Sequence, residues 1–113
     1  MSLNHVALTV ADRERSAAFY GQHFGLSKRV HDDEHLLILG AEDGSLLALS
    51  EGSPPPLPRT NHFGFRLSRP ADVLAARERL RGSNVEEAEW QAEGPTRVQV
   101  LDPDGYRVEL YAF

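Results

Sequence analysis

The stretch Leu3-Asn4-His5-Val6-Ala7-Leu8-Thr9-Val10 decides the fold, because Thr60-Asn61-His62-Phe63-Gly64-Phe65-Arg66-Leu67 repeats its pattern 57 residues later. Each copy places an Asn-His pair before apolar residues that recur at period two, the pattern of a half-buried strand. A polar break and an apolar pattern of helical period follow each copy. The separation is half of the 113 residues. The sequence therefore predicts two copies of one module, each of which opens with a histidine.

Length and composition predict a single domain over residues 1–113. The absence of cysteine excludes disulfides, thiolate catalysis and cysteine-ligated zinc. The net charge of -5, with both signs interspersed, leaves no basic face for nucleic acid. No apolar run reaches the roughly 18 residues that span a bilayer, and no secretory signal precedes the first strand. We therefore expect a cytoplasmic protein that binds neither nucleic acid nor membrane.

The first module, residues 1–50, predicts the order β-α-β-β-β. Its first strand runs from Leu3 to Val10. Asp12 is the expected N-cap of the following helix, which ends near Gly25. Three more strands are expected at residues 26–31, 35–39 and 45–50, separated by turns that are rich in acidic residues and glycine.

A linker of residues 51–60 with four prolines, extended and stiff, separates this module from the second one, residues 61–113. The second module predicts the same β-α-β-β-β order. Pro70 lies near the first position of its helix, and Gly82 is expected to end that helix. The expected strands cover residues 61–67, 84–90, 97–101 and 107–113, and Asp102-Pro-Asp-Gly105 forms the last turn.

Each module is predicted to be a small sheet with one face under a helix, an α+β arrangement whose paired sheets form a cupped surface. Because alternate side chains of a strand leave opposite faces, Val6, Leu8 and Val10 are expected under the first helix. The same parity places His5, His62 and Glu109 on the open, concave side.

Two imidazoles and one carboxylate suit a divalent cation such as Fe(II), Mn(II), Ni(II) or Zn(II), and they leave coordination positions open for substrate, water or dioxygen. A single inward histidine on a strand is more often a hydrogen-bonded structural residue than a ligand. Because His5 and His62 occupy corresponding positions of the internal repeat, a role as metal ligands is favoured over a structural role for the two together. A buried Glu109 without a cation or a donor would be costly.

The chain resembles the vicinal oxygen chelate superfamily, which comprises the glyoxalase, bleomycin-resistance and extradiol dioxygenase proteins. The resembling segments are Asn4-His-Val-Ala-Leu-Thr-Val10, Ser16-Ala-Ala-Phe-Tyr20, Phe24-Gly-Leu26, Asn61-His-Phe-Gly-Phe65 and Asp102-Pro-Asp-Gly-Tyr-Arg-Val-Glu-Leu110. The resemblance implies a cupped, half-open barrel and a divalent metal held by His5, His62 and Glu109, with no other cofactor. It also implies a homodimer. His5 comes either from the same subunit as His62 and Glu109 or, in a module-swapped dimer, from the other subunit, and the sequence leaves both arrangements open.

The chain departs from relatives of the glyoxalase I type, which use a fourth, carboxylate ligand on the fourth strand. Ala48 occupies that position here, and Glu51 is expected to face the other way. This argues against ordinary glyoxalase I activity. The remaining His-His-Glu set resembles that of extradiol dioxygenases and of fosfomycin-resistance thiol transferases, but the acidic and apolar segment Glu89-Trp-Gln-Ala-Glu-Gly-Pro95 suits a phosphonate poorly.

Three residues are candidates for substrate binding. Gln99 and Arg97 share strand parity and could orient a substrate beside the metal, although Arg97 could equally be solvated or paired across strands. Trp90, the only tryptophan, could be a substrate wall, a dimer contact or a core residue. Two further residues are candidates for catalysis: Tyr111, which has the parity of Glu109, and His35, which is expected on a strand.

Two functions of different class follow. The first is a metal-dependent enzyme of dioxygenase, lyase or transferase type that acts on a small oxygen-bearing molecule. The alternative is a metal-free protein that binds a drug or metabolite, as relatives of the bleomycin-resistance type do. The retained set of His5, His62 and Glu109 favours the enzyme.

Overall fold

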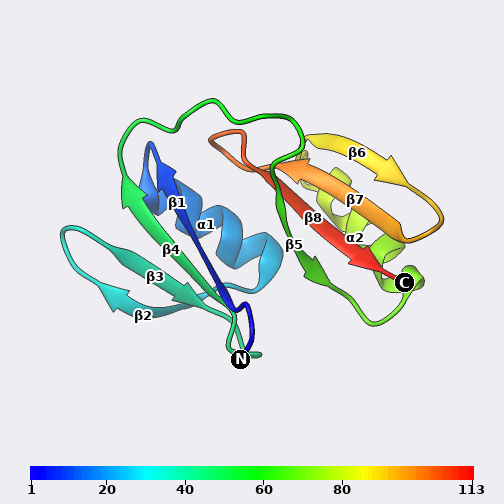
Figure 1. Ribbon diagram of the computed structural model, residues 1–113, viewed down its shortest axis with the longest axis horizontal. Coiled ribbons are helices and arrows are strands. Elements are labelled where there is room, and N and C mark those ends of the chain that lie inside the picture. Colours follow the sequence, from blue (N-terminus) through cyan, green and yellow to red (C-terminus); the bar gives the residue numbers. More distant parts are fainter. The chain divides into compact units, whose positions relative to one another are not determined.

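A computed structural model describes all residues, 1–113. The chain divides into two compact units, Met1–Pro56 and Leu57–Phe113. Both have the element order β-α-β-β-β, which confirms the predicted α+β fold of two like modules (Figure 1). Neither helix has the length and apolar character that crossing a membrane requires. The elements are β1 (His5–Val10), α1 (Arg13–Phe24), β2 (Lys28–Asp32), β3 (Leu37–Gly40), β4 (Leu46–Glu51), β5 (Phe63–Arg66), α2 (Pro70–Gly82), β6 (Glu87–Gln91), β7 (Thr96–Leu101) and β8 (Arg107–Ala112).

The sheet of the first unit has the strand order β1-β4-β3-β2, with β1 parallel to β4. Helix α1 begins where Asp12 accepts hydrogen bonds from the backbone N–H groups of the next turn, and it ends at Gly25, whose φ is 71°. Tyr20 on α1 and Leu8 and Val10 on β1 are buried, as the predicted parity requires. The helix therefore covers the expected face of the strand.

The sheet of the second unit has the corresponding order β5-β8-β7-β6, with β5 parallel to β8. Pro70 is at the start of α2, as predicted, because its missing N–H costs nothing there. Gly82 was expected to end the helix but remains helical, and the chain turns at Asn84, whose φ is 60°. Asparagine tolerates this left-handed conformation better than most residues. The following strand therefore begins at Glu87 rather than at Asn84.

The turn before β8 is closed by Asp102. Its carboxylate accepts hydrogen bonds of 2.9 Å from the backbone N–H groups of Asp104 and Tyr106. Gly105 donates to the Asp102 carbonyl at 3.0 Å and has a φ of 89°, which only glycine adopts without strain. This local network fixes the register in which β8 pairs with β7.

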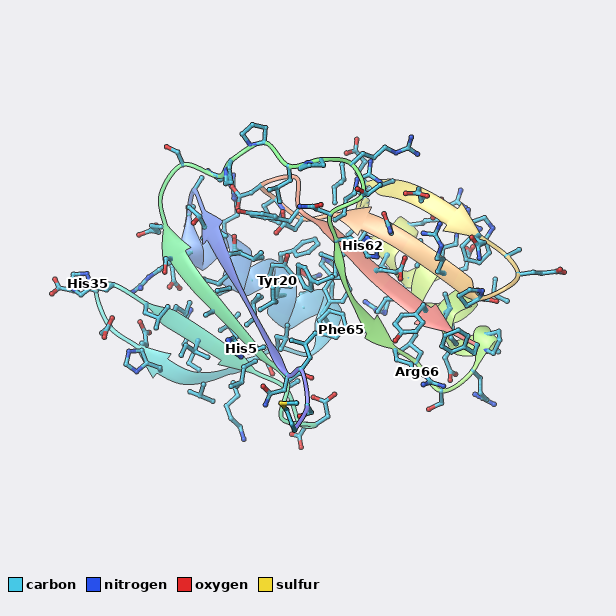
Figure 2. The ribbon with its side chains drawn as sticks, in the orientation of Figure 1. His5, Tyr20, His35, His62, Phe65 and Arg66 are labelled. Carbon is cyan, nitrogen blue, oxygen red and sulfur yellow. The ribbon has the colours of Figure 1, made fainter.

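His35 does not lie on a strand, contrary to expectation, because β3 begins at Leu37. The Asp33 carboxylate accepts 2.8 Å hydrogen bonds from the N–H groups of His35 and Leu36, which ties this segment into a turn. The His35 side chain is 84% exposed and lies at the outer end of the β2–β3 hairpin (Figure 2). It therefore faces solvent rather than the open face of the sheet.

Asp33→Asn is expected to lower the thermal unfolding midpoint at pH 7. Hydrogen bonds from the His35 N–H, the His31 side chain and the Leu36 N–H lower the pKa of Asp33 from 3.8 to about 2. Because the folded pKa is below the unfolded one, the stabilisation is complete above pH 4 and is lost as pH falls towards 2. The gap between variant and wild type should close over that range. Thermal unfolding followed by circular dichroism measures it, and a gap that does not change with pH would contradict this role.

Candidate functional site

A polar row crosses the sheet of the second unit on the face opposite α2. The register pairs Gly64 with Glu109, Glu109 with Gln99, and Gln99 with Glu89, so one residue from each strand contributes. Paired residues project on the same face of a sheet. The neighbouring Leu110 projects to the other face and is buried in the core. The strand parity predicted for Glu109 is therefore correct.

The two carboxylate oxygens of Glu109 have different surroundings. Oε1 accepts hydrogen bonds from Arg97 Nη1 and from Gln99 Nε2, both at 3.1 Å. Oε2 lies 3.8 Å from Nε2 of His62. The side chain of Glu109 is 12% exposed, so its position is well defined by these neighbours. One oxygen is therefore occupied by internal donors, and the other faces the imidazole.

The orientation of His62 is set by the backbone. Its Nδ1 lies 2.9 Å from the Thr60 carbonyl oxygen, which can only accept, so Nδ1 carries the proton. In the neutral imidazole the lone pair is then on Nε2, on the side of Glu109. A backbone carbonyl that fixes the tautomer in this way is typical of metal-binding histidines.

The pair His62 and Glu109 fits a divalent cation. The distance of 3.8 Å between Nε2 and Oε2 is too long for a hydrogen bond. Two ligand atoms that bind one ion at 2.0–2.2 Å lie at most about 4.2 Å apart, so one ion can contact both. A neutral imidazole and a carboxylate are also ligands that Fe(II), Mn(II), Ni(II) and Zn(II) accept.

The third predicted ligand, His5, belongs to the first unit, where it is the exposed first residue of β1. Its parity is as predicted, because it alternates with the buried residues Leu8 and Val10. No group of three or more potential ligands meets in the structure. The structure thus brings together His62 and Glu109, and the joint role of His5 with them stays a prediction.

The first unit offers no carboxylate at the fourth-ligand position. Ala48 on β4 pairs with Ala7 and Ile38, and the register runs without a bulge to Glu51. Glu51 pairs with the buried Val10 and accepts a 3.3 Å hydrogen bond from the N–H of Arg13 at the start of α1. Glu51 therefore faces the helix, which is the orientation expected from the sequence.

A pocket of about 420 Å³ opens beside His62 and Glu109. This volume is in the lower part of the range of small-molecule sites, so the pocket suits a small ligand. All of its lining residues come from the second unit. They are Arg59, Thr60, His62, Glu89, Gln91, Gly94, Pro95, Arg97, Gln99 and Glu109.

Arg97 lines this pocket but already has three partners. Its Nη1 binds Glu109 at 3.1 Å, its Nη2 binds Glu89 at 3.3 Å, and its Nε binds Gln91 at 3.3 Å. Of the two interpretations open from the sequence, cross-strand pairing is thus the one that the contacts support. Gln99 is 3% exposed and links Glu109 to Arg107. Its Nε2 donates to Glu109, and its side-chain oxygen Oε1 accepts a 3.2 Å hydrogen bond from Arg107 Nη1.

Glu89 is a site residue that the sequence pattern does not reveal. The register shifts between Glu87 and Glu89, where a bulge inserts one residue. Glu87 consequently bonds Arg77 of α2, at 2.7 and 3.1 Å, whereas Glu89 lies on the opposite face and bonds Arg97 and Arg107. Simple alternation would place both glutamates on one face, so no signal in the sequence identifies the difference.

Trp90 is not brought together with the pocket residues. It pairs with the buried Val98, and the Arg77 guanidinium lies 4.1 Å from its ring centroid, so it is on the helix side of the sheet. Tyr111 is on the same face as Arg97, its register partner, and its ring packs edge-on against Phe113 at 5.8 Å. It does not line the pocket.

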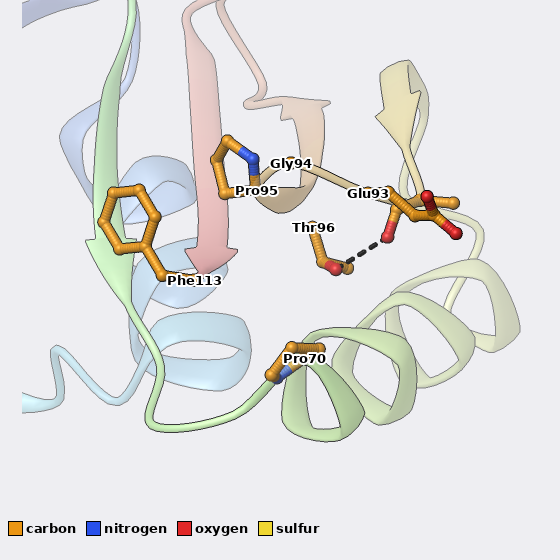
Figure 3. A pocket seen from close by; sticks show the side chains of 7 residues that line it. Pro70, Glu93, Gly94, Pro95, Thr96 and Phe113 are labelled. Atoms are coloured by element: carbon orange, nitrogen blue, oxygen red, sulfur yellow. Dashed lines mark hydrogen bonds between the residues drawn. The ribbon is translucent and has the colours of Figure 1, made fainter.

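A second pocket of about 520 Å³ shares Gly94 and Pro95 with the first one (Figure 3). The Thr96 hydroxyl donates to the Ala92 carbonyl at 2.7 Å and holds this loop. Pro70 and Phe113 complete a mainly apolar lining. None of the residues predicted for the site lines this apolar pocket, whereas His62, Arg97, Gln99 and Glu109 line the first one, which we call the polar pocket.

Gly64→Ala is expected to destabilise the fold by about 1–3 kcal/mol, the range for overpacking a filled site. A Cβ at Gly64 would lie 2.9 Å from the backbone oxygen of Glu109 and 3.0 Å from its Cβ. Gly82→Ala is the matched control, because a Cβ there meets nothing within 4 Å and alanine is the better helix former. Urea unfolding measures both. A Gly64→Ala variant as stable as Gly82→Ala would refute the close packing.

Comparison with known proteins gives the following relationships. Residues 2–110 match the model of the Glyoxalase/Bleomycin resistance protein/Dioxygenase superfamily. The structure of a possible glyoxalase from Bacillus cereus is 25% identical, with 97% of both chains covered and a TM-score of 0.82. The genomically encoded fosfomycin resistance protein FosX from Listeria monocytogenes is 21% identical, with 100% of this chain and 93% of that chain covered and a TM-score of 0.85. A lactoylglutathione lyase from Agrobacterium tumefaciens is 21% identical, with coverage of 98% and 92% and a TM-score of 0.80. No curated protein sequence matches significantly.

Proposed function

The chain belongs to the Glyoxalase/Bleomycin resistance protein/Dioxygenase superfamily, and on this premise we propose that it is a divalent-metal-dependent enzyme that acts on a small oxygen-bearing molecule. One observation carries the proposal. The Thr60 carbonyl fixes the proton of His62 on Nδ1, which leaves the lone pair of Nε2 available to a metal ion, 3.8 Å from Oε2 of Glu109. This arrangement, with one ring nitrogen held by a backbone carbonyl and the other left facing a carboxylate, is the one found in metal-binding histidines.

We assign His62, Glu109 and His5 as the metal ligands, with His5 inferred from its place in the internal repeat. The cation would supply Lewis acidity or, as iron, activation of dioxygen. The chain's own residues orient the ligands: Thr60 holds His62, and Gln99 with Arg97 holds Oε1 of Glu109. Oε2 and Nε2 therefore remain for the ion.

The reaction class that this site supports is dioxygenase, lyase or transferase chemistry. Ala48 adds no fourth ligand, so more positions stay open for substrate than in a four-ligand site. A solved structure of the Listeria FosX is titled as a complex with Mn(II) and sulfate ion, at 20% identity and a TM-score of 0.82. Mn(II) is accordingly a suitable probe beside Fe(II), Ni(II) and Zn(II).

One observation favours the second function, a metal-free protein that binds a drug or metabolite. Arg97 and Gln99 already donate to Glu109, so its carboxylate does not need a cation in order to be buried. No buried side-chain polar atom in the structure lacks a hydrogen-bond partner. The fold is thus compatible with a site that works without metal.

Metal analysis distinguishes the two functions. The protein is purified without chelators, and its metal content is measured by mass spectrometry. The enzyme proposal expects about one divalent ion per chain, and thermal stabilisation when Mn(II), Fe(II), Ni(II) or Zn(II) is added to protein stripped of metal. A protein that holds no divalent metal and shows no thermal shift with any of the four would be a metal-free binding protein.

We further propose a cytoplasmic homodimer, on the resemblance of the chain to relatives that form dimers. Light scattering coupled to size-exclusion chromatography measures the mass directly. Twice the chain mass of 12.6 kDa is expected.

A further inference from the structure

The charged groups of the polar pocket are paired with one exception. Two glutamates and two arginines line the pocket. Glu109 is bound by Arg97, and Glu89 is bound by both Arg97 and Arg107. The side chain of Arg59 has no hydrogen-bond or ion-pair partner. Arg59 is therefore the one cation of the pocket that is available to a ligand.

A tight turn presents Arg59 at the pocket. The N–H of Asn61 donates to the Pro58 carbonyl at 3.0 Å, which closes a turn with Arg59 and Thr60 at its centre. Proline before the turn restricts its backbone. The carbonyl of Thr60 in the same turn accepts from Nδ1 of His62. One short segment thus places Arg59 in the lining of the pocket and orients the neighbouring imidazole.

We propose that the pocket binds the acidic group of an anionic substrate, a carboxylate, phosphate or phosphonate, through Arg59. A guanidinium offers such oxyanions two parallel hydrogen bonds. The formal charges of the four lining residues cancel, so a divalent cation would leave two positive charges in excess and favour an anion further. This inference deepens the function proposed above, and the contribution of the divalent cation rests on that function.

The acidic segment of residues 89–95 does not oppose this proposal. From the sequence, Glu89 in this segment argues against an anion. In the structure, its Oε1 lies 3.3 Å from Arg97 Nη2 and its Oε2 lies 3.2 Å from Arg107 Nη1. Both oxygens of the carboxylate are thus neutralised, and Arg59 is supplied by the linker rather than by this segment.

Ligand titrations followed by nuclear magnetic resonance test the proposal on metal-free and Zn(II)-loaded protein. The probes are glycolate and methylphosphonate, with ethylene glycol as a neutral analogue of glycolate. Arg59→Gln should weaken both anions roughly 5- to 10-fold, the loss expected for a charge-assisted contact at a solvent-exposed site. Arg59→Lys should retain part of the affinity. Arg81→Gln, an equal charge change at an exposed position of α2, should not change it.

The outcomes separate this proposal from the metal site. Anion binding that depends on Arg59 in metal-free protein, without any binding of Zn(II), would support the anion site and refute the metal enzyme. Equal affinity of wild type and Arg59→Gln for both anions would overturn the anion site even where Zn(II) binds. Wild type that binds neither anion, or binds ethylene glycol as tightly, would overturn it too. A preference for glycolate or for methylphosphonate identifies the acid class.

Discussion

Glu109→Gln is expected to weaken the binding of Mn(II) by 100-fold or more. The substitution keeps the shape of the side chain but replaces a charged oxygen ligand with a neutral amide, which hard divalent cations bind poorly. It also places an NH₂ group either towards Nε2 of His62 or against the donors Arg97 and Gln99. The affinity is measured by the electron paramagnetic resonance signal of free Mn(II) during titration.

Glu86→Gln is the matched control for this variant. Glu86 is an exposed carboxylate of the same unit and does not line the pocket. It should bind Mn(II) as wild type does. Mn(II) affinity that is the same in wild type, Glu86→Gln and Glu109→Gln would place the cation elsewhere.

Arg97→Met is expected to destabilise the protein by about 1–3 kcal/mol, the cost of leaving hydrogen-bonded groups without their partner. Arg97 donates to Glu109, Glu89 and Gln91, and its side chain is 25% exposed, so water replaces these contacts only in part. Without Arg97, the carboxylates of Glu89 and Glu109 would no longer have a guanidinium between them. Urea unfolding at pH 7 measures the effect.

Arg81→Met is the comparison for Arg97→Met. It changes charge and size by the same amount, but at an exposed residue that does not line the pocket. Its effect should be within about 0.5 kcal/mol of wild type. If Arg97→Met were as stable as Arg81→Met, the contacts of Arg97 would not hold the row together, and a direct role towards substrate would again be open.

Strand parity and local capping signals were enough to predict much of the fold. Asp12 and Gly25 delimit α1 because capping depends on residues close in sequence. Glu109 could be assigned to the open face because β8 alternates without interruption between buried and less buried residues. The position of Glu51 on the helix side follows from the same uninterrupted alternation in β4.

The features that could not be predicted depend on contacts between distant segments. Because of the bulge between them, Glu87 and Glu89 project from opposite faces of the sheet, and only the pairing with β7 reveals this bulge. His35 was expected on a strand, but Asp33 captures its N–H in a turn. Whether Arg97 is free to bind a substrate could not be predicted either. It depends on the hydrogen-bond acceptors of the strands on both sides of β7, and the strand order decides which strands these are. Arg59 could not be assigned to the site from the sequence, because only a turn in the proline-rich linker brings it to the pocket.

The most direct test of the central claim is pulsed electron paramagnetic resonance on the Mn(II)-loaded protein, which counts the imidazole nitrogens bound to the ion. The assignment of His5, His62 and Glu109 predicts two directly coordinated imidazole nitrogens in wild type. His62→Ala at saturating Mn(II) should retain one. A wild-type spectrum with fewer than two such nitrogens, or a protein that binds no Mn(II) at all, would contradict the proposed site.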